Sequence, residues 1–576
     1  MEINNAEQYF RLLSKVLTPF SLARLTNANI IWIDKQQYLP DSNSLIRNQS
    51  FLRDFAACVP CEAFSGAFKE TAGLSAWAEP YGGAGVTGNG GGARVGVLSE
   101  YQVKGIGPNP LAGQYVDPFH SYGTLLADQG TSEVIFSLLA AKLLPIGSVS
   151  VIGLVDTGST ISFSDKDVAS WRTGGRNVLM VRKNTLRPAH FMQALNFVPQ
   201  TGSEPVCGDK ERVCCVVRAA EAAYNDSNQQ PLSRLFDDFI SNAARQFAAA
   251  RANRLIHGAL SPSNLAVNGA WLDLSMMSVL PVGKNYRFGN ETHSFLEESG
   301  GPLEVLKEWL HNVNKYSEYH YEFDMFESGY REMFRYHYFG ELLKLVGVEV
   351  PPDIDAADED TVAVANLLDA ALCGDTRIYS LTHPIKNKDN PLLQVIINLY
   401  TRSDLTIDGP AAALRRTLMS QYAVTQGHDS IVFEHYRFAR FLDCVRQAIF
   451  STVFFRPHFD ELVRGLSVSE LGGFIVSAQE QISCIWSQGK LSNGWVVSLL
   501  NCIGVNLTID CQKGIINYNK QRYELNATTI AFLRERLIER DLKWYGYNLY
   551  PKLELFFEII EQFLIAFPWS NQDDVR

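Results

Sequence analysis

Short apolar runs in the first third of the chain predict β-strands near a glycine-rich loop. The runs cover residues 100–104, 149–155 and 177–182. Residues 81–96 hold too many glycines for a helix and are predicted to form a loop or a strand–turn–strand unit. This part of the chain is therefore expected to contain most of the strands.

Helical periodicity dominates the rest of the chain. In residues 132–144 the apolar side chains recur at helical spacing, and Pro145 ends the predicted helix. A second helix is predicted from residue 235 to about residue 255. Beyond about residue 300 the pattern is mostly helical, and residues 529–567 hold two amphipathic helices.

The composition is that of a folded protein and narrows the possible partners. The chain has 576 residues, of which 46% are apolar and 20% are charged, enough for a two-lobed unit with an appended domain. A net charge of -11 argues against nucleic acid as the main partner. The most apolar window, residues 134–155, is interrupted by Lys142, Pro145 and Gly147, so no membrane span is predicted. The first residues lack the features of a secretory signal, and the expected location is the cytoplasm.

The ten cysteines do not form the pattern of a disulfide framework. Cys58 and Cys61 have the spacing of half a zinc site or of a redox pair, but no second pair with similar spacing follows. Buried, reduced thiols are the favoured interpretation.

Several residues occur in the order that phosphoryl or nucleotidyl transfer requires. Such chemistry needs backbone amides around phosphates, a lysine held by a carboxylate, and oxygen ligands for Mg²⁺. The glycine-rich stretch is followed by Lys104 at a strand end, Glu133 in a helix, and then Asn264 and Asp273. Each feature alone is weak, but their order favours a nucleotide site.

Two neighbouring stretches carry a resemblance to a known family. Residues 81–94 and 101–110 resemble the YxGHQFG loop, the GDGRA turn and the QLKGxGPTP strand of the SelO (YdiU) protein adenylyltransferases, which are pseudokinases. Phe64, Ser65 and Gly66 match the FSG of that family. The resemblance covers roughly residues 15–385 and implies an α+β, two-lobed protein-kinase-like fold that binds ATP and Mg²⁺.

The resemblance also implies roles for particular residues. Lys104 would hold the phosphates and Glu133 would pair with it, both as catalytic residues, while Asn264 and Asp273 would bind Mg²⁺. Paired hydrogen bonds from an arginine fork suit phosphate oxygens. The residues implied for the nucleotide are Gly88, Gly90, Gly91, Gly92, Arg94, Lys104, Arg182 and Arg187.

The chain departs from the family at the general base. The family has an aspartate immediately before the metal-binding asparagine, where this chain has Ser263. Aligned instead with the HGDxxxxN pattern of small-molecule kinases, the chain has Ala259 at the aspartate position. In addition, Gly83 to Val86 replace HQFG. Loss of a general base costs about 10²- to 10⁴-fold in rate with a hydroxyl acceptor, but a carboxylate acceptor is already an anion at neutral pH.

Adenylyl transfer to a carboxylate is therefore the expected activity. A weaker resemblance, in overall size and organisation, is to the MchC/MceJ proteins of microcin gene clusters. These act with an acyltransferase-like partner to join a catechol siderophore to a peptide, which requires carboxylate activation. The resemblance implies a peptide or protein substrate and a role in the maturation of such a bacteriocin.

Two alternatives remain open: a catalytically inactive pseudokinase scaffold, and, less favoured, kinase chemistry on a hydroxyl.

The expected domains are an N-terminal lobe (1–200), a mainly helical lobe with the metal-binding loop (201–385) and a mostly helical C-terminal domain (386–576). A polar run, residues 386–391, is the predicted linker.

Overall fold

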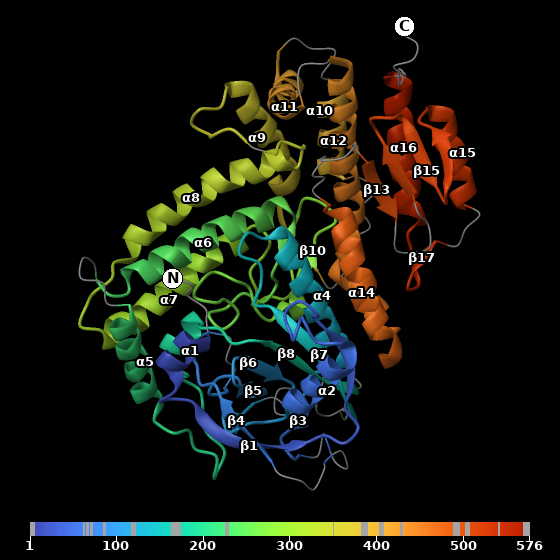
Figure 1. The fold of residues 1–576 in the computed structure, drawn as a ribbon. Helices are drawn as coiled ribbons and strands as arrows, with labels where there is room; N and C mark the ends of the chain where they lie inside the picture. Colours follow the sequence, from blue (N-terminus) through green and yellow to red (C-terminus); the bar gives the residue numbers. More distant parts are fainter. Residues whose placement is uncertain are drawn as a thin grey trace.

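The chain combines an antiparallel sheet with many helices (Figure 1). This mixed content of helix and antiparallel strand agrees with the predicted α+β class. The computed structural model describes residues 6–61, 64, 68, 73–84, 88–116, 122–162, 174–224, 230–349, 351–381, 390–402, 408–426, 430–487, 496–500, 507–538 and 542–567. Parts of the predicted motifs, namely Ser65, Gly66, Gly85, Val86 and residues 386–389, lie outside these ranges.

The first part of the chain forms one eight-stranded sheet with the strand order β2-β7-β8-β6-β5-β4-β1-β3. All of its strand pairs are antiparallel. The strands are β1 (Thr18–Arg24), β2 (Asn29–Ile33), β3 (Ala57–Cys58), β4 (Leu74–Ala78), β5 (Val95–Leu98), β6 (Tyr101–Lys104), β7 (Val151–Ser162) and β8 (Gly174–Lys183). The three predicted strands are confirmed as parts of β6, β7 and β8. The β6–β8 register places Gln102 opposite Arg182.

Helix α4 (Ala127–Leu143) packs on β7 and β8. It begins five residues before the predicted start at residue 132 and ends, as predicted, just before Pro145. Gly130 lies in the added turn, where an added Cβ would come within 2.8 Å of the Val178 side chain. This glycine permits close packing of helix on strand, a requirement that helical periodicity does not reveal.

A group of helices follows the sheet. These are α5 (Asp209–Ala223), α6 (Ser233–Ala252), α7 (Gly301–Tyr316), α8 (Phe323–Lys344) and α9 (Glu359–Cys373), with α1 (Ala6–Leu13) beside α5 and α2 (Ser44–Phe55) beside β2. The predicted helix at residues 235–255 is confirmed as α6, which ends three residues early because Arg254 has a left-handed φ of 58°. Short elements lie between α6 and α7: β9 (Leu255–Ile256), η3 (Leu274–Met276), β10 (Ser278–Val279) and β11 (Lys284–Arg287). Strand β12 (Asp375–Ser380) follows α9 and pairs in parallel with β11.

The last part of the chain holds further helices and a sheet that the sequence pattern did not predict. The helices are α10 (Pro391–Thr401), α11 (Pro410–Gln426), α12 (Ser430–Phe450), α13 (Arg456–Arg464), α14 (Val468–Ile485), α15 (Ala527–Ile538) and α16 (Tyr550–Ala566). The four-stranded sheet comprises β13 (Val496–Leu500), β14 (Leu507–Asp510), β15 (Ile515–Tyr518) and β16 (Gln521–Glu524). The two predicted amphipathic helices are α15 and α16.

One hydrophobic core runs from the sheet and α4 through α6 to α8 and into the C-terminal helices. Among the described residues, no helix is long and apolar enough to cross a membrane. None of the cysteines in the described ranges is joined in a disulfide, which agrees with the interpretation of reduced thiols; Cys58, Cys444 and Cys511 are buried and the others are partly buried.

Candidate functional site

A buried ion pair joins the sheet to α4. Lys104 lies at the end of β6, and its Nζ is 2.8 Å from Oε2 of Glu133 in α4. The two side chains are only 4% and 2% exposed. A pair so deeply buried is stable only when both charges have partners, because each has lost its hydration. The structure therefore brings the predicted lysine and glutamate together.

Asp273 is the more exposed carboxylate of the same cluster. Its Oδ1 is 2.5 Å from Lys104 Nζ and 2.9 Å from Arg182 Nη1, and its Oδ2 is 3.9 Å from Arg187 Nη1. Burial opposes ionisation of this carboxyl, but the charges of Lys104, Arg182 and Arg187 hold its pKa well below the ordinary value. At 23% side-chain exposure it is the member that a ligand can reach.

The two predicted arginines donate hydrogen bonds to the same acceptor, the side-chain oxygen of Gln102. Arg182 Nε donates to this Oε1 at 3.0 Å and Arg187 Nη2 at 3.1 Å. Arg187 Nη1 also donates to the backbone oxygen of Ser263 at 2.7 Å. Both guanidinium groups are therefore fixed in orientation, as binding of a phosphate would require.

The predicted metal ligands lie on two sides of a short hairpin. The bridge between Leu265 and Trp271, with Leu272 N–H donating to the carbonyl of Asn264 at 2.9 Å, brings Asn264 near Asp273. The Asn264 amide nitrogen donates to the Ala259 carbonyl at 2.7 Å, which fixes the amide. Asp273 has a left-handed φ of 55°, a strained conformation for a residue with a side chain.

Asn264 and Asp273 carry side-chain oxygens of the kind that Mg²⁺ prefers. Mg²⁺ prefers oxygen ligands and commonly takes one or two from protein while substrate phosphates and water supply the others. Among the described residues there is no group of three or more His, Cys, Asp or Glu side chains that would hold a metal by itself. Asn264 and Asp273 together would therefore hold Mg²⁺ only with phosphate oxygens.

The predicted glycines and Arg94 are placed by packing against the protein. The N–H groups of Gly90 and Gly92 already donate to the carbonyls of Leu111 and Glu79. An added Cβ on Gly90 would lie 2.5 Å from the Phe197 ring, and one on Gly91 would lie 2.3 Å from the Glu79 carbonyl. Arg94 donates to the Thr124 carbonyl at 3.0 Å. In this conformation the N–H groups of Gly90 and Gly92 are already used within the protein.

A second, fully buried layer supports Arg187, and the sequence analysis did not identify it. Glu79 accepts hydrogen bonds from Tyr9 at 2.7 Å and from Gln102 at 2.8 and 2.9 Å, and its Oε1 lies 3.1 Å from His190 Nε2. Its Oε2 lies 3.7 Å from Arg187 Nη2. One signal was available for Gln102, because it precedes Lys104 by two residues and so lies on the same face of β6.

No carboxylate occupies either position expected for a general base. Ala259 is one of them, and at the other the Ser263 hydroxyl lies 3.0 Å from the hydroxyl of Ser261. The loop that contains Ala259 is held instead by Glu298. One carboxylate oxygen of Glu298 accepts the backbone N–H of His257 and the other accepts that of Gly258, both at 2.8 Å. Burial raises the pKa of the Glu298 carboxyl to about 7, although these hydrogen bonds oppose the shift.

Replacing Glu298 by glutamine is expected to change how stability depends on pH. A carboxyl whose pKa is raised on folding stabilises the fold below its ordinary pKa, and this contribution is lost as the pH rises through about 7. The native protein should lose up to about 3 kcal/mol of unfolding free energy in this way above about pH 4.5. Glu298→Gln has no such group and should show a flatter profile in urea unfolding between pH 5 and 8. Equal slopes for both proteins would contradict the prediction.

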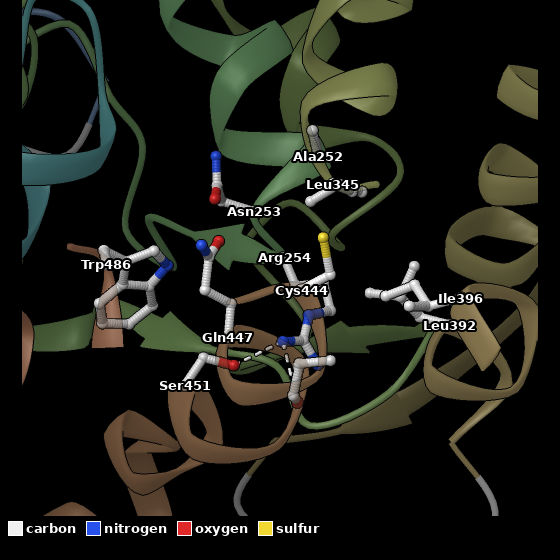
Figure 2. Close-up of a pocket in the computed structure, with 11 residues that line it drawn as sticks. Ala252, Asn253, Arg254, Leu345, Leu392, Ile396, Cys444, Gln447, Ser451 and Trp486 are labelled. Atoms are coloured by element: carbon white, nitrogen blue, oxygen red, sulfur yellow. Dashed lines mark hydrogen bonds between the residues drawn. The ribbon is translucent and has the colours of Figure 1, made fainter. Parts of the chain in front are cut away.

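A cavity lies away from this cluster, at the junction of α6, α10 and α12 (Figure 2). Arg254 lines this cavity. Its guanidinium donates to Ser451 Oγ at 2.5 Å, to Pro281 O at 3.1 Å and to Ala448 O at 3.4 Å. Lys104, Glu133, Asp273 and the two arginines are not among its lining residues. The cavity is thus separate from the ionic cluster.

No protein-family model and no curated protein matches the chain.

Proposed function

We propose that this chain is a divergent SelO-like protein that binds ATP with Mg²⁺ in a two-lobed, kinase-like cleft and transfers the adenylyl group to a carboxylate. The antiparallel sheet carrying Lys104 and helix α4 carrying Glu133 would form the upper lobe. The hairpin carrying Asn264 and Asp273, with helices α5 to α9, would form the lower one.

A single observation carries the proposal: three buried cations converge on one partly exposed carboxylate. Lys104, Arg182 and Arg187 all lie within 3.9 Å of Asp273. Such a group of fixed donors suits the negative charge of a polyphosphate, which it would stabilise without further reorganisation. Mg²⁺ bound by Asn264 and Asp273 would neutralise charge on the phosphates and polarise the α-phosphorus.

The chemistry follows from the absence of a base at residues 259 and 263. A carboxylate oxygen attacks the α-phosphorus of ATP, and the bond from this phosphorus to the bridging oxygen of pyrophosphate breaks. The products are an acyl adenylate and pyrophosphate, so no proton must be removed from the nucleophile. A peptide α-carboxyl, with a pKa of roughly 3.3 to 3.7, is fully ionised at neutral pH.

The acceptor belongs to a partner molecule in this proposal. A peptide or protein with a free carboxyl group would bind beside Asp273, and an acyltransferase-like partner protein would use the activated carboxyl to form an ester or amide. The maturation of a siderophore-peptide microcin in the cytoplasm is the setting that this chemistry suits, with no role for nucleic acid or a membrane span.

A catalytically inactive pseudokinase scaffold is the second candidate. It is favoured by Ala259 and Ser263, which leave the loop without a carboxylate at either expected position. In that case nucleotide would stabilise the fold, and the C-terminal helices would recruit the partner enzyme.

The test compares ATP labelled at the α position with ATP labelled at the γ position, with Mg²⁺, candidate peptides and the acyltransferase-like partner present. We expect label from the α position to reach a carboxyl group, or AMP to be released only when a carboxylate is present. Transfer to a hydroxyl would contradict carboxylate activation. ATP binding without any transfer would favour the scaffold, and no binding would refute the nucleotide site itself.

A further inference from the structure

Helix α13, in the C-terminal part of the chain, contacts the helix that carries Glu133. Phe136 lies one turn after Glu133 in α4 and is completely buried. Its ring centroid is 5.2 Å from that of Phe459 in α13, in an edge-to-face arrangement. The guanidinium of Arg456, the first residue of α13, lies 5.7 Å from the Phe136 ring centroid. Aromatic and cation–π contacts of this geometry therefore attach α13 to α4.

The same helix is also attached to the segment that follows Asp273. The backbone N–H of Arg456 donates to Ser278 Oγ at 3.0 Å, so a side chain of β10 satisfies the first amide of α13. Ser278 lies five residues after Asp273 and is completely buried. Arg456 is fixed in turn by Asp460, with a distance of 2.6 Å between Nε and Oδ1.

Helix α14 extends this support along α4 and to the sheet. It packs beside α4 (Figure 1). It also contacts β2. Gly472 in α14 approaches the Ile31 carbonyl so closely that an added Cβ would lie 2.4 Å from it. Phe474 in α14 packs on Phe459, with 5.7 Å between ring centroids. The contact of α13 with α4 is thus part of a continuous packed surface.

We infer that α13 is a brace that sets the positions of Glu133 and Asp273 relative to each other. Both carboxylates bind one ammonium group, Lys104 Nζ, at 2.8 and 2.5 Å, although they come from elements far apart in the chain. A small shift of α4 against the Asp273 segment would separate one of them from Lys104. The effect of this brace on nucleotide binding rests on the proposed function. Phe459, Arg456 and Ser278 are the residues that position the two carboxylates.

The experiment compares Phe459→Ala with Phe441→Ala in the full chain. Phe441 is an equally buried aromatic residue of α12 whose ring stacks on Phe563 at 4.7 Å. Hydrogen exchange over α4 and the affinity for ATP with Mg²⁺ are measured for both variants. We expect Phe459→Ala to increase exchange across α4 and weaken ATP binding by about tenfold, within the range for mutations between coupled elements. Phe441→Ala should do neither.

Milder variants keep the test decisive if alanine at position 459 prevents folding. Phe459→Leu should restore most of the affinity. Ser278→Ala, which removes the acceptor for Arg456 N–H and a longer hydrogen bond to the Val279 carbonyl, should produce the same change in α4 exchange to a smaller extent. Equal exchange of α4 in the Phe459 and Phe441 variants would overturn the brace. Failure of the native protein to bind ATP would overturn the proposed function, while the exchange difference would still decide the brace.

Discussion

Replacing Asp273 by asparagine is expected to reduce Mg²⁺-dependent adenylyl transfer by about a thousandfold, since a catalytic metal supplies several kcal/mol of charge stabilisation. Asparagine has nearly the same shape and retains one oxygen, so the hairpin should stay folded. The loss would come from the charge that faces Mg²⁺ and from the ion pairs with Lys104 and Arg182.

The same variant should bind metal-free ATP or pyrophosphate at least as tightly as the native protein does. Without the carboxylate, Lys104, Arg182 and Arg187 would face a phosphate with no competing anion from residue 273. Calorimetric titration with and without Mg²⁺ measures both effects, and transfer assays measure the rate. Asp375→Asn is a matched control, because Asp375 is also 23% exposed and ion-paired, with Arg377. Mg²⁺-dependent transfer within tenfold of the native rate would refute the role given to Asp273.

Replacing Glu79 by glutamine is expected to lower the free energy of unfolding by about 3–5 kcal/mol, as when one partner of a buried ion pair is removed. Glu79 and Arg187 are both completely buried, so water cannot compensate the guanidinium charge. Urea unfolding at neutral pH measures the change. Glu327→Gln is the control, because Glu327 pairs with Arg331, a residue that is 69% exposed, and such pairs contribute less than about 1 kcal/mol.

The difference between the native protein and Glu79→Gln should disappear in acid. Burial raises the pKa of Glu79, but the Arg187 charge and hydrogen bonds from His190 and Tyr9 outweigh it and lower the pKa to about 2. A carboxyl with a lowered pKa stabilises the fold above its ordinary pKa, and that contribution is lost as the pH falls through about 2. A stability difference that stays constant from pH 5 to the acid limit would show that Glu79 acts by shape and not by charge.

Local patterns in the sequence were sufficient for the elements that carry the cluster. Helical spacing and Pro145 located most of α4, and short apolar runs located β6, β7 and β8, because a helix or strand buries a face whose period is visible along the chain. The order of Lys104, Glu133, Asn264 and Asp273 also indicated which residues to examine. The start of α4 was missed because Gly130 serves close packing on Val178, which has no periodic signature.

Contacts between distant positions were decided only by the tertiary structure. The β6–β8 register places Gln102 beside Arg182, and Glu79 reaches Arg187 from a different strand end, so neither supporting residue follows from spacing alone. Packing likewise gave Gly90 and Gly92 a structural role, since their N–H groups are bonded to carbonyls. The contact of Phe459 with Phe136 joins residues over 300 positions apart.

The sequence by itself thus determined the local elements and the candidate residues for phosphate and metal. The tertiary structure decided which of these residues share one charge network and which part of the chain holds α4 in place. The physical reason is that periodicity and propensity act over a few residues. Buried charges, in contrast, require partners at distances of about 3 Å, and only the folding of remote segments onto one another supplies them.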